Sequence, residues 1–131
     1  MNNEFEVFDA IIIGSGQGGT PLAMKLARTG WKVALVERWH VGGSCINIAC
    51  TPTKTMIASA RVAHLVGRAG EFGINSNIES VDLSKILERK KEVVESFRNG
   101  LKKQLLSTKG LTLMEGEARF VGKKLLEVSM K

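Results

Sequence analysis

The sequence predicts an α/β fold, in which a parallel sheet is joined to a long amphipathic helix and a small antiparallel meander. Three observations predict it: an apolar run at residues 8–13 stops at a glycine-rich turn, a second apolar run covers residues 31–37, and a helical periodicity begins near residue 84. The 131 residues are enough for one domain with a substantial core. With 44% apolar and 24% charged residues, the composition is typical of a soluble globular protein.

Composition and charge argue against several classes of protein. No segment approaches the roughly 18 consecutive apolar residues of a membrane-spanning helix. Residues 1–6 are polar and acidic, unlike a secretory signal, so we expect a cytoplasmic protein. The net charge of +6 lies entirely in residues 85–131, where Phe97 and Phe120 are the only aromatic side chains that bases could stack on. We therefore expect neither a membrane nor a nucleic acid as partner.

Residues 8–37 predict one βαβ unit. The continuous apolar run at residues 8–13 is typical of a strand that is buried on both faces of a parallel sheet. A stretch with helical spacing follows and ends at Thr29-Gly30, a helix C-cap signal. Pro21 falls in the first helical turn, where its missing N–H is harmless. Residues 31–37 then form the second strand.

The turn of this unit carries the pattern G-x-G-x-x-G. Gly14 allows a tight turn, Gly16 lets the backbone approach a pyrophosphate, and Gly19 permits close packing of the helix on the strand. Glu37 ends the second strand, where its carboxylate can accept hydrogen bonds from both hydroxyls of an adenosine ribose and would repel a 2′-phosphate. The unit therefore predicts dinucleotide binding, with a plain structural turn as the alternative.

Cys45 and Cys50 are the only cysteines. On an ideal helix their α-carbons would be about 8.6 Å apart, whereas a disulfide needs about 4.4–6.8 Å, so a bridge requires a distorted helix or a loop. Pro52 can restart a helix just after them. Because structural disulfides are rare in the cytosol, a bridged pair would be catalytic. Two unconnected thiols are an alternative, as is a zinc site with His40 and His64, although that spacing matches no common ligand pattern.

The segment around the cysteines resembles the motif GGTCxNxGCxPxK of the pyridine nucleotide–disulfide oxidoreductases, a flavoprotein family that includes dihydrolipoyl dehydrogenase, glutathione reductase and mercuric reductase. The matching residues are Gly42, Gly43, Ser44, Cys45, Asn47, Cys50, Pro52 and Lys54. Ser44 replaces a threonine and keeps its hydroxyl, while Ala49 replaces a glycine and adds a methyl group that could strain the turn. The resemblance covers essentially the whole chain but only the opening part of the family's longer polypeptide.

The resemblance implies roles for three catalytic residues. Cys45 resembles the interchange thiol, which exchanges with the substrate. Cys50 resembles the thiol beside the flavin. Lys54 lies one helical turn after Cys50, where its ammonium would stabilise negative charge on the reduced flavin and lower the pKa of the thiolate.

The resemblance also implies FAD as cofactor, bound by a Rossmann-like domain over residues 1–131. Gly42 and Gly43 would let the chain pass close to FAD, Ser44 would bond its phosphates, and the backbone around Gly116 and Ala118 would face the adenine. The full set implied for binding is Gly14, Gly16, Gly19, Glu37, Gly42, Gly43, Ser44, Lys54, Gly116 and Ala118. No resident metal is expected.

The remaining elements follow from periodicity. A long amphipathic helix is predicted from an N-cap at Asp82 or Ser84 to Gly110, with one apolar stripe and with its Lys and Arg side chains in solvent. The stripe consists of Leu87, Val94, Phe97, Leu101 and Leu105. Three strands are predicted after it, at residues 111–115, 118–121 and 125–128, with a turn at Gly122-Lys123. In the family, the first of these extends the parallel sheet.

The implied reaction passes electrons from NAD(P)H through FAD and the Cys45–Cys50 pair to a disulfide or metal-ion acceptor. The intact enzyme would be a homodimer. Segments for NAD(P)H binding and dimerisation have no counterpart in the sequence, so we expect an incomplete N-terminal FAD-binding region that is inactive alone. The alternative is a non-catalytic, stand-alone nucleotide-binding or interaction fragment.

Overall fold

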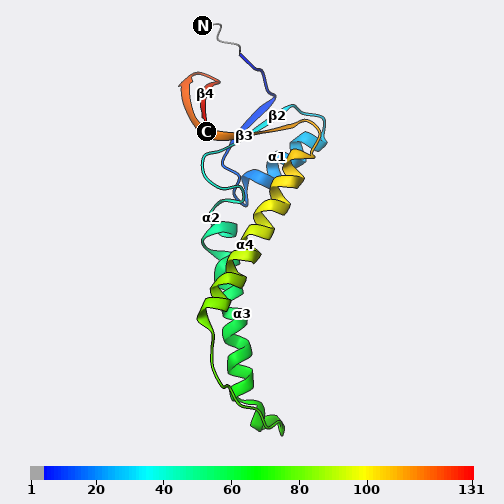
Figure 1. The fold of residues 1–131 in the computed structure, drawn as a ribbon. Coiled ribbons are helices and arrows are strands. Elements are labelled where there is room, and N and C mark those ends of the chain that lie inside the picture. Colours follow the sequence, from blue (N-terminus) through cyan, green and yellow to red (C-terminus); the bar gives the residue numbers. More distant parts are fainter. Residues whose placement is uncertain (1–4) are drawn as a thin grey trace.

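The computed structural model describes residues 5–131 (Figure 1). The expectation that the chain has no secretory signal rests on residues 1–6, most of which lie outside the described residues. Strand β1 (Ala10–Ile13), helix α1 (Gly19–Arg28) and strand β2 (Val33–Glu37) form the predicted βαβ unit, with β1 parallel to β2. The elements that follow are α2 (Gly43–Asn47), α3 (Cys50–Gly67), the 3₁₀ helix η1 (Ala69–Phe72), α4 (Leu83–Leu106), β3 (Leu111–Gly122) and β4 (Leu125–Met130).

The sheet has the order β1-β2-β3-β4, which makes β2 an inner strand and β1 an edge. All five residues of β2 are buried. In β1, Ile12 packs on the core but Ile11 and Ile13 are 38% and 50% exposed. The expectation that this strand is buried on both faces is therefore wrong: β1 pairs on one side only, and one of its faces has no covering layer.

Two predicted strands are one continuous strand. Residues 111–115 of β3 pair in parallel with β2, as expected, and residues 116–122 pair antiparallel with β4. The chain stays extended through Gly116, where β4 crosses so closely that a Cβ would lie 2.5 Å from the carbonyl oxygen of Ser129. The turn that follows is Lys123-Lys124 rather than Gly122-Lys123, with Lys124 in the left-handed region at φ 57°. The predicted meander is thus a hairpin built on the end of a sheet strand.

Helices α3 and α4 lie side by side and project away from the sheet as a long arm (Figure 1). Asp82 caps α4, its Oδ1 accepting a hydrogen bond from the Lys85 amide at 3.1 Å. The helix ends at Leu106, earlier than predicted, because the chain turns before Gly110 leads into β3. Two positions of the apolar stripe are buried, Val94 in the middle of the helix and Leu105 near the sheet, whereas Phe97 is 57% exposed.

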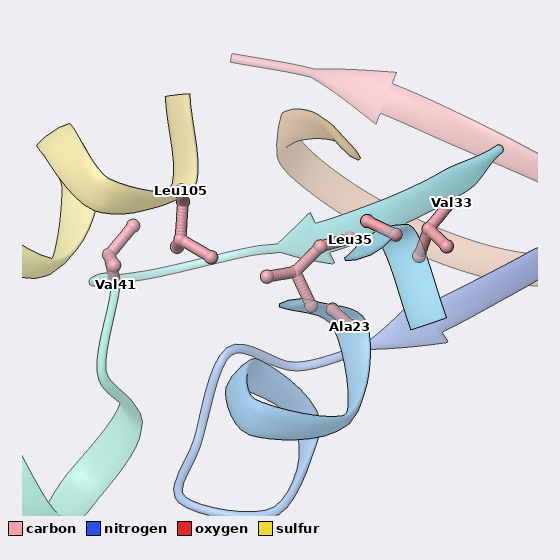
Figure 2. Packing of buried hydrophobic residues seen from close by; sticks show 6 residues of the cluster. Ala23, Val33, Leu35, Val41 and Leu105 are labelled. Carbon is pink, nitrogen blue, oxygen red and sulfur yellow. The ribbon is translucent and has the colours of Figure 1, made fainter. Parts of the chain in front are cut away.

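The core lies at the sheet end of the molecule. Its buried cluster joins α1, β2, the loop before α2 and the end of α4, as Figure 2 shows for Ala23, Val33, Leu35, Val41 and Leu105. This packing fixes the carboxyl ends of the three parallel strands relative to one another. Every described helix is too short or too polar to cross a membrane.

Candidate functional site

The carboxyl ends of β1 and β2 meet the middle of β3, just past its parallel part, at one small cavity of about 180 Å³. Its lining consists of Ile13, Gly14, Val36, Glu37, Arg38, Gly116, Glu117 and Ala118. Four of these, Gly14, Glu37, Gly116 and Ala118, are residues that the sequence assigned to cofactor binding. Ligands of parallel α/β sheets bind at this edge of the sheet, so the cavity lies where a dinucleotide is expected.

The glycine turn is shaped by close backbone contacts. Gly14 has φ 94°, which disfavours any residue with a side chain. A Cβ at Gly19 would lie 2.0 Å from the Gly14 carbonyl oxygen, so α1 packs directly on the end of β1, as expected. A Cβ at Gly16 would meet no atom within 4 Å, and one at Gly43 would lie 2.9 Å from the Gly16 Cα. The turn is therefore open on one side and packed on the other against the start of the cysteine motif.

Glu37 is held as a buried carboxylate by three donors. It is 7% exposed, and its Oε2 accepts hydrogen bonds from the Ser15 amide at 2.9 Å and the Ser15 hydroxyl at 2.6 Å. Its Oε1 accepts a bond from the Trp39 amide at 2.7 Å. Burial raises the pKa of Glu37, but the bonds from Ser15 and Trp39 outweigh it and the pKa is lowered overall. The carboxylate stays charged at the cavity, with little of its acceptor capacity still free.

Ser15 is a residue that sequence reasoning missed. It is fully buried, and its hydroxyl, besides donating to Glu37, accepts a hydrogen bond from the Gly42 amide at 3.1 Å. Its carbonyl accepts from the Thr20 hydroxyl at 2.7 Å. Ser15 thus joins the glycine turn, the end of β2 and the cysteine motif. The only signal in the sequence is a small polar residue between two of the glycines.

The two cysteines lie on different helices. Cys45 is half-buried in α2, Cys50 is the exposed first residue of α3, and both thiols are free. The helix is interrupted between them, so the segment departs from an ideal helix, as a disulfide between the two would require. Ala49 in the interruption has φ −118° and ψ −94°, so its methyl group imposes no left-handed strain.

Cys50 and Lys54 both influence the Cys45 thiol. Hydrogen bonding with the Cys50 thiol, then burial, raises the pKa of the Cys45 thiol, and the positive charge of Lys54 opposes this rise. Lys54 is exposed in the first turn of α3, one turn after Cys50. Among residues 5–131 the structure gathers no cluster of three or more His, Cys, Asp or Glu that could hold a metal, so the zinc alternative has no ligand set there.

The segment before Cys45 needs its glycines. Gly42 and Gly43 have φ values of 97° and 60°, both in the left-handed region. A Cβ at Gly42 would also lie 2.5 Å from the Ile46 Cδ1. Ser44 follows at the exposed start of α2, where its hydroxyl is accessible to a ligand.

The sequence suggested that the basic side chains of α4 lie in solvent, but three of them bond neighbouring elements instead. Arg89 donates to the Thr55 carbonyl of α3 at 3.1 Å, and Arg98 donates through Nε to Asn47 of α2 at 2.7 Å. Lys102 pairs with Glu115 of β3 at 2.8 Å. The expectation of a purely solvent-facing basic surface is wrong at these three positions, because neighbouring elements present carbonyl and carboxylate acceptors to them.

Residues 8–130 match the sequence model of the family described as pyridine nucleotide-disulphide oxidoreductase. The chain belongs to this family. A dihydrolipoyl dehydrogenase of Acholeplasma laidlawii is 43% identical over 117 residues, covering 88% of this chain and 34% of that protein. A mercuric reductase of Bacillus cereus is 34% identical over 122 residues, covering 93% of this chain and 19% of that protein.

A solved structure gives the same assignment. The Cu(II) complex of the HOCl-induced flavoprotein disulfide reductase RclA from Escherichia coli aligns with a TM-score of 0.75 and 34% sequence identity, over 92% of this chain and 24% of that one. The chain thus shares both sequence and fold with family members. It spans about a fifth to a third of the length of the curated relatives cited above.

Proposed function

We propose that residues 1–131 form the N-terminal FAD-binding and redox-disulfide region of an NAD(P)H-dependent flavoprotein disulfide oxidoreductase. The observation that carries the proposal is the convergence of predicted cofactor residues from three strands on one cavity, with the cysteine motif packed against the neighbouring glycine turn. The names of the relatives, dihydrolipoyl dehydrogenase and mercuric reductase, support the same class of chemistry.

The chain's own residues fit a dinucleotide. The open side of Gly16 leaves room for a pyrophosphate beside the start of α1, whose N-terminus favours negative charge. Glu37 would bond a ribose hydroxyl, and the backbone of Gly116 and Ala118 would face the adenine. Gly42 and Gly43 would let the chain pass beside the cofactor, with the Ser44 hydroxyl turned to its phosphates. FAD, when bound, would accept a hydride from NAD(P)H and pass the electron pair to the cysteines.

The cysteine pair would carry the electrons onward. Two electrons and two protons reduce a Cys45–Cys50 disulfide to two thiols. Cys45 then attacks a disulfide acceptor as the thiolate and forms a mixed disulfide. Cys50 resolves it, so that the Cys45–Cys50 bond re-forms and the acceptor leaves as two thiols. A metal ion would instead take the electron pair from the thiolates, and in both cases Lys54 would stabilise the negative charge that develops at the pair.

The whole protein would act on a small disulfide or a metal ion, the classes of acceptor that the relatives' names suggest. We expect it to act as a homodimer. The substrate pocket and the NAD(P)H site would be formed by further parts of such an enzyme. The residues of this chain would supply the cofactor-binding turn and the exchange thiols.

Flavin binding tests the proposal with a matched pair of glycine variants. Gly16→Ala and Gly18→Ala each add a methyl group that meets no protein atom within 4 Å, so both should fold normally. Because Gly16 faces the expected pyrophosphate, we expect Gly16→Ala to weaken FAD binding by roughly tenfold or more. Gly18→Ala should bind FAD as the unmodified chain does. Titration of flavin fluorescence measures both.

Two results would contradict the proposal: no FAD binding by the unmodified chain, or equal binding by the two variants. A second measurement separates redox function from nucleotide binding alone. On partial reduction of the FAD-loaded chain, we expect a long-wavelength absorption band that Cys50→Ser removes. FAD binding without this band would favour the non-catalytic, nucleotide-binding alternative.

A further inference from the structure

The side-chain amide of Asn47 ties together the turn that carries Cys45. Asn47 is the last residue of α2, and its Nδ2 donates hydrogen bonds to the Gly43 carbonyl at 2.7 Å and the Val41 carbonyl at 3.0 Å. Its Oδ1 accepts a hydrogen bond from Arg98 Nε at 2.7 Å. Only this orientation of the amide satisfies every partner, because the reverse would set its oxygen against two carbonyls and its NH₂ group against a guanidinium.

Helix α2 depends on contacts from outside itself. Five residues are too few for a helix to be stable alone, and no side chain caps its N-terminus. Ile46 is its only buried residue. Across residues 5–131, and apart from the hydrogen bonding between the Cys45 and Cys50 thiols, the bond from Arg98 to Asn47 is the only side-chain hydrogen bond that links α2 to another helix. The position of Cys45 therefore depends on a contact from α4.

Helix α4 is a firm support for this contact. One turn after Arg98, Lys102 bonds both carboxylate oxygens of Glu115 on β3, at 2.8 and 2.9 Å. Towards its start, Arg89 bonds the Thr55 carbonyl, directly after Lys54. The helix is thus fixed to the sheet at one end and to α3 at the other, with Arg98 between these anchors.

We propose that Arg98, acting through Asn47, is a positioning residue that holds Cys45 in place for disulfide exchange with Cys50. The inference rests on the proposed redox function of the cysteine pair. Disulfide geometry is demanding, and a turn that is already ordered loses less entropy when the bond closes. Without the Arg98 contact α2 moves more freely, and the Cys45–Cys50 disulfide becomes less favourable relative to the dithiol.

A glutathione equilibrium measures this effect directly. One glutathione disulfide oxidises the two thiols to the Cys45–Cys50 disulfide and leaves as two reduced glutathione molecules. We expect Arg98→Met to lower the equilibrium constant roughly three- to tenfold, as for residues of one hydrogen-bonded network. Asn47→Ala should have a similar effect, and the double variant should show no further loss. Acid trapping, thiol labelling and mass spectrometry give the disulfide fraction.

Lys102→Met is the matched control. It removes a cation and an ion pair from the same helix one turn away, but its partner is β3 and not the cysteine turn. Both variants are expected to lower the urea midpoint of unfolding, whereas only Arg98→Met should shift the glutathione equilibrium. If Arg98→Met does not fold, Arg98→Lys decides, because it keeps the charge but loses the planar guanidinium and should shift the equilibrium in the same direction.

The results separate this inference from the proposed function. If the unmodified chain forms the disulfide, but Arg98→Met and Lys102→Met shift its glutathione equilibrium equally, only the positioning role is overturned. The positioning role is also overturned if the double variant loses the sum of the two single effects of Arg98→Met and Asn47→Ala on the glutathione equilibrium. An unmodified chain that forms no Cys45–Cys50 disulfide at any glutathione ratio overturns the redox function as well.

Discussion

The sheet end and the helical arm of this molecule are stabilised in different ways. At the sheet end, all of β2 is buried and the core cluster surrounds it. In the arm, formed by α3, η1 and the first half of α4, the 18 residues of α3 include only one buried side chain, Thr55. Large apolar side chains of α3, among them Ile57 and Val62, remain mostly exposed. Apolar packing therefore positions the cavity at the ends of the parallel strands, whereas polar cross-links position the cysteine turn at the base of the arm.

This difference has a consequence for local stability. Regions with few buried apolar contacts open at lower free energy than the core. The cysteine turn lies where the two regions meet, with Val41 in the core before it and α3 after it. The hydrogen bonds of Ser15 and Asn47 connect the well-packed sheet end to the turn that carries the thiols.

A pair of leucine truncations tests the comparison with the largest expected effect. Leu35 in β2 is fully buried and Leu65 in α3 is 49% exposed. Leu35→Ala leaves a cavity in the core and should lower the free energy of unfolding by about 2–5 kcal/mol. Leu65→Ala, at a half-exposed helical position, should lower it by less than about 1 kcal/mol. Urea unfolding followed by circular dichroism measures both, and equal losses would show that the arm is packed as firmly as the sheet end.

Removal of the Ser15 hydroxyl tests the polar link between the regions, with a smaller expected effect. Ser15→Ala leaves the Glu37 carboxylate buried with one donor fewer and the Gly42 amide without its acceptor. We expect a loss of about 1–3 kcal/mol in the free energy of unfolding at neutral pH. Ser96→Ala, the same change on an exposed face of α4, should stay within about 0.5 kcal/mol. A loss for Ser15→Ala no larger than that of the control would contradict the assigned network.

The same variant has a pH signature. The folded-state pKa of Glu37 is lowered, so its contribution to stability is fully present above its unfolded pKa and is lost as the pH falls through the folded one. Ser15→Ala removes a bond that lowers this pKa and should flatten the acid side of the stability profile. Unfolding curves measured from about pH 7 down to about pH 3 would show it. An unchanged acid slope would mean that the Ser15 hydroxyl does not hold the charge of Glu37.

Local patterns in the sequence predicted the βαβ unit and placed the cap of the long helix at Asp82 or Ser84, of which the structure selects Asp82. These features depend on neighbours a few residues apart, such as the glycine spacing that brings Gly14 and Gly19 into contact. The exposure of β1 could not be read in this way. Its apolar run is the same whether one face or both are covered, and only the position at the edge of the sheet decides.

Residues that act over long sequence distances were also missed. Arg98 reaches Asn47 across 51 positions, and within α4 it is one basic residue among many, with nothing local to distinguish it from a solvated one. Ser15 occupies a variable position of the glycine pattern, and its bonds to Glu37 and Gly42 depend on how three elements meet. The motifs predicted which residues carry the chemistry, whereas the residues that position them required the structure.

The alanine that departs from the family motif gives the smallest expected effect. Ala49 is the N-cap of α3, at the base of the arm, with φ −118° and ψ −94°, outside the left-handed region. In Ala49→Gly, glycine is the better N-cap by up to about 1 kcal/mol, but its freer unfolded chain lowers stability by about 0.4–1 kcal/mol. These opposing terms should leave the free energy of unfolding within about 0.5 kcal/mol of the original. Because no left-handed strain is relieved, the glutathione equilibrium of Cys45 and Cys50 should stay within about twofold. A larger shift towards the disulfide would show that the Ala49 methyl group restrains the cysteine turn, and that local backbone shape limits exchange there alongside the contact from α4.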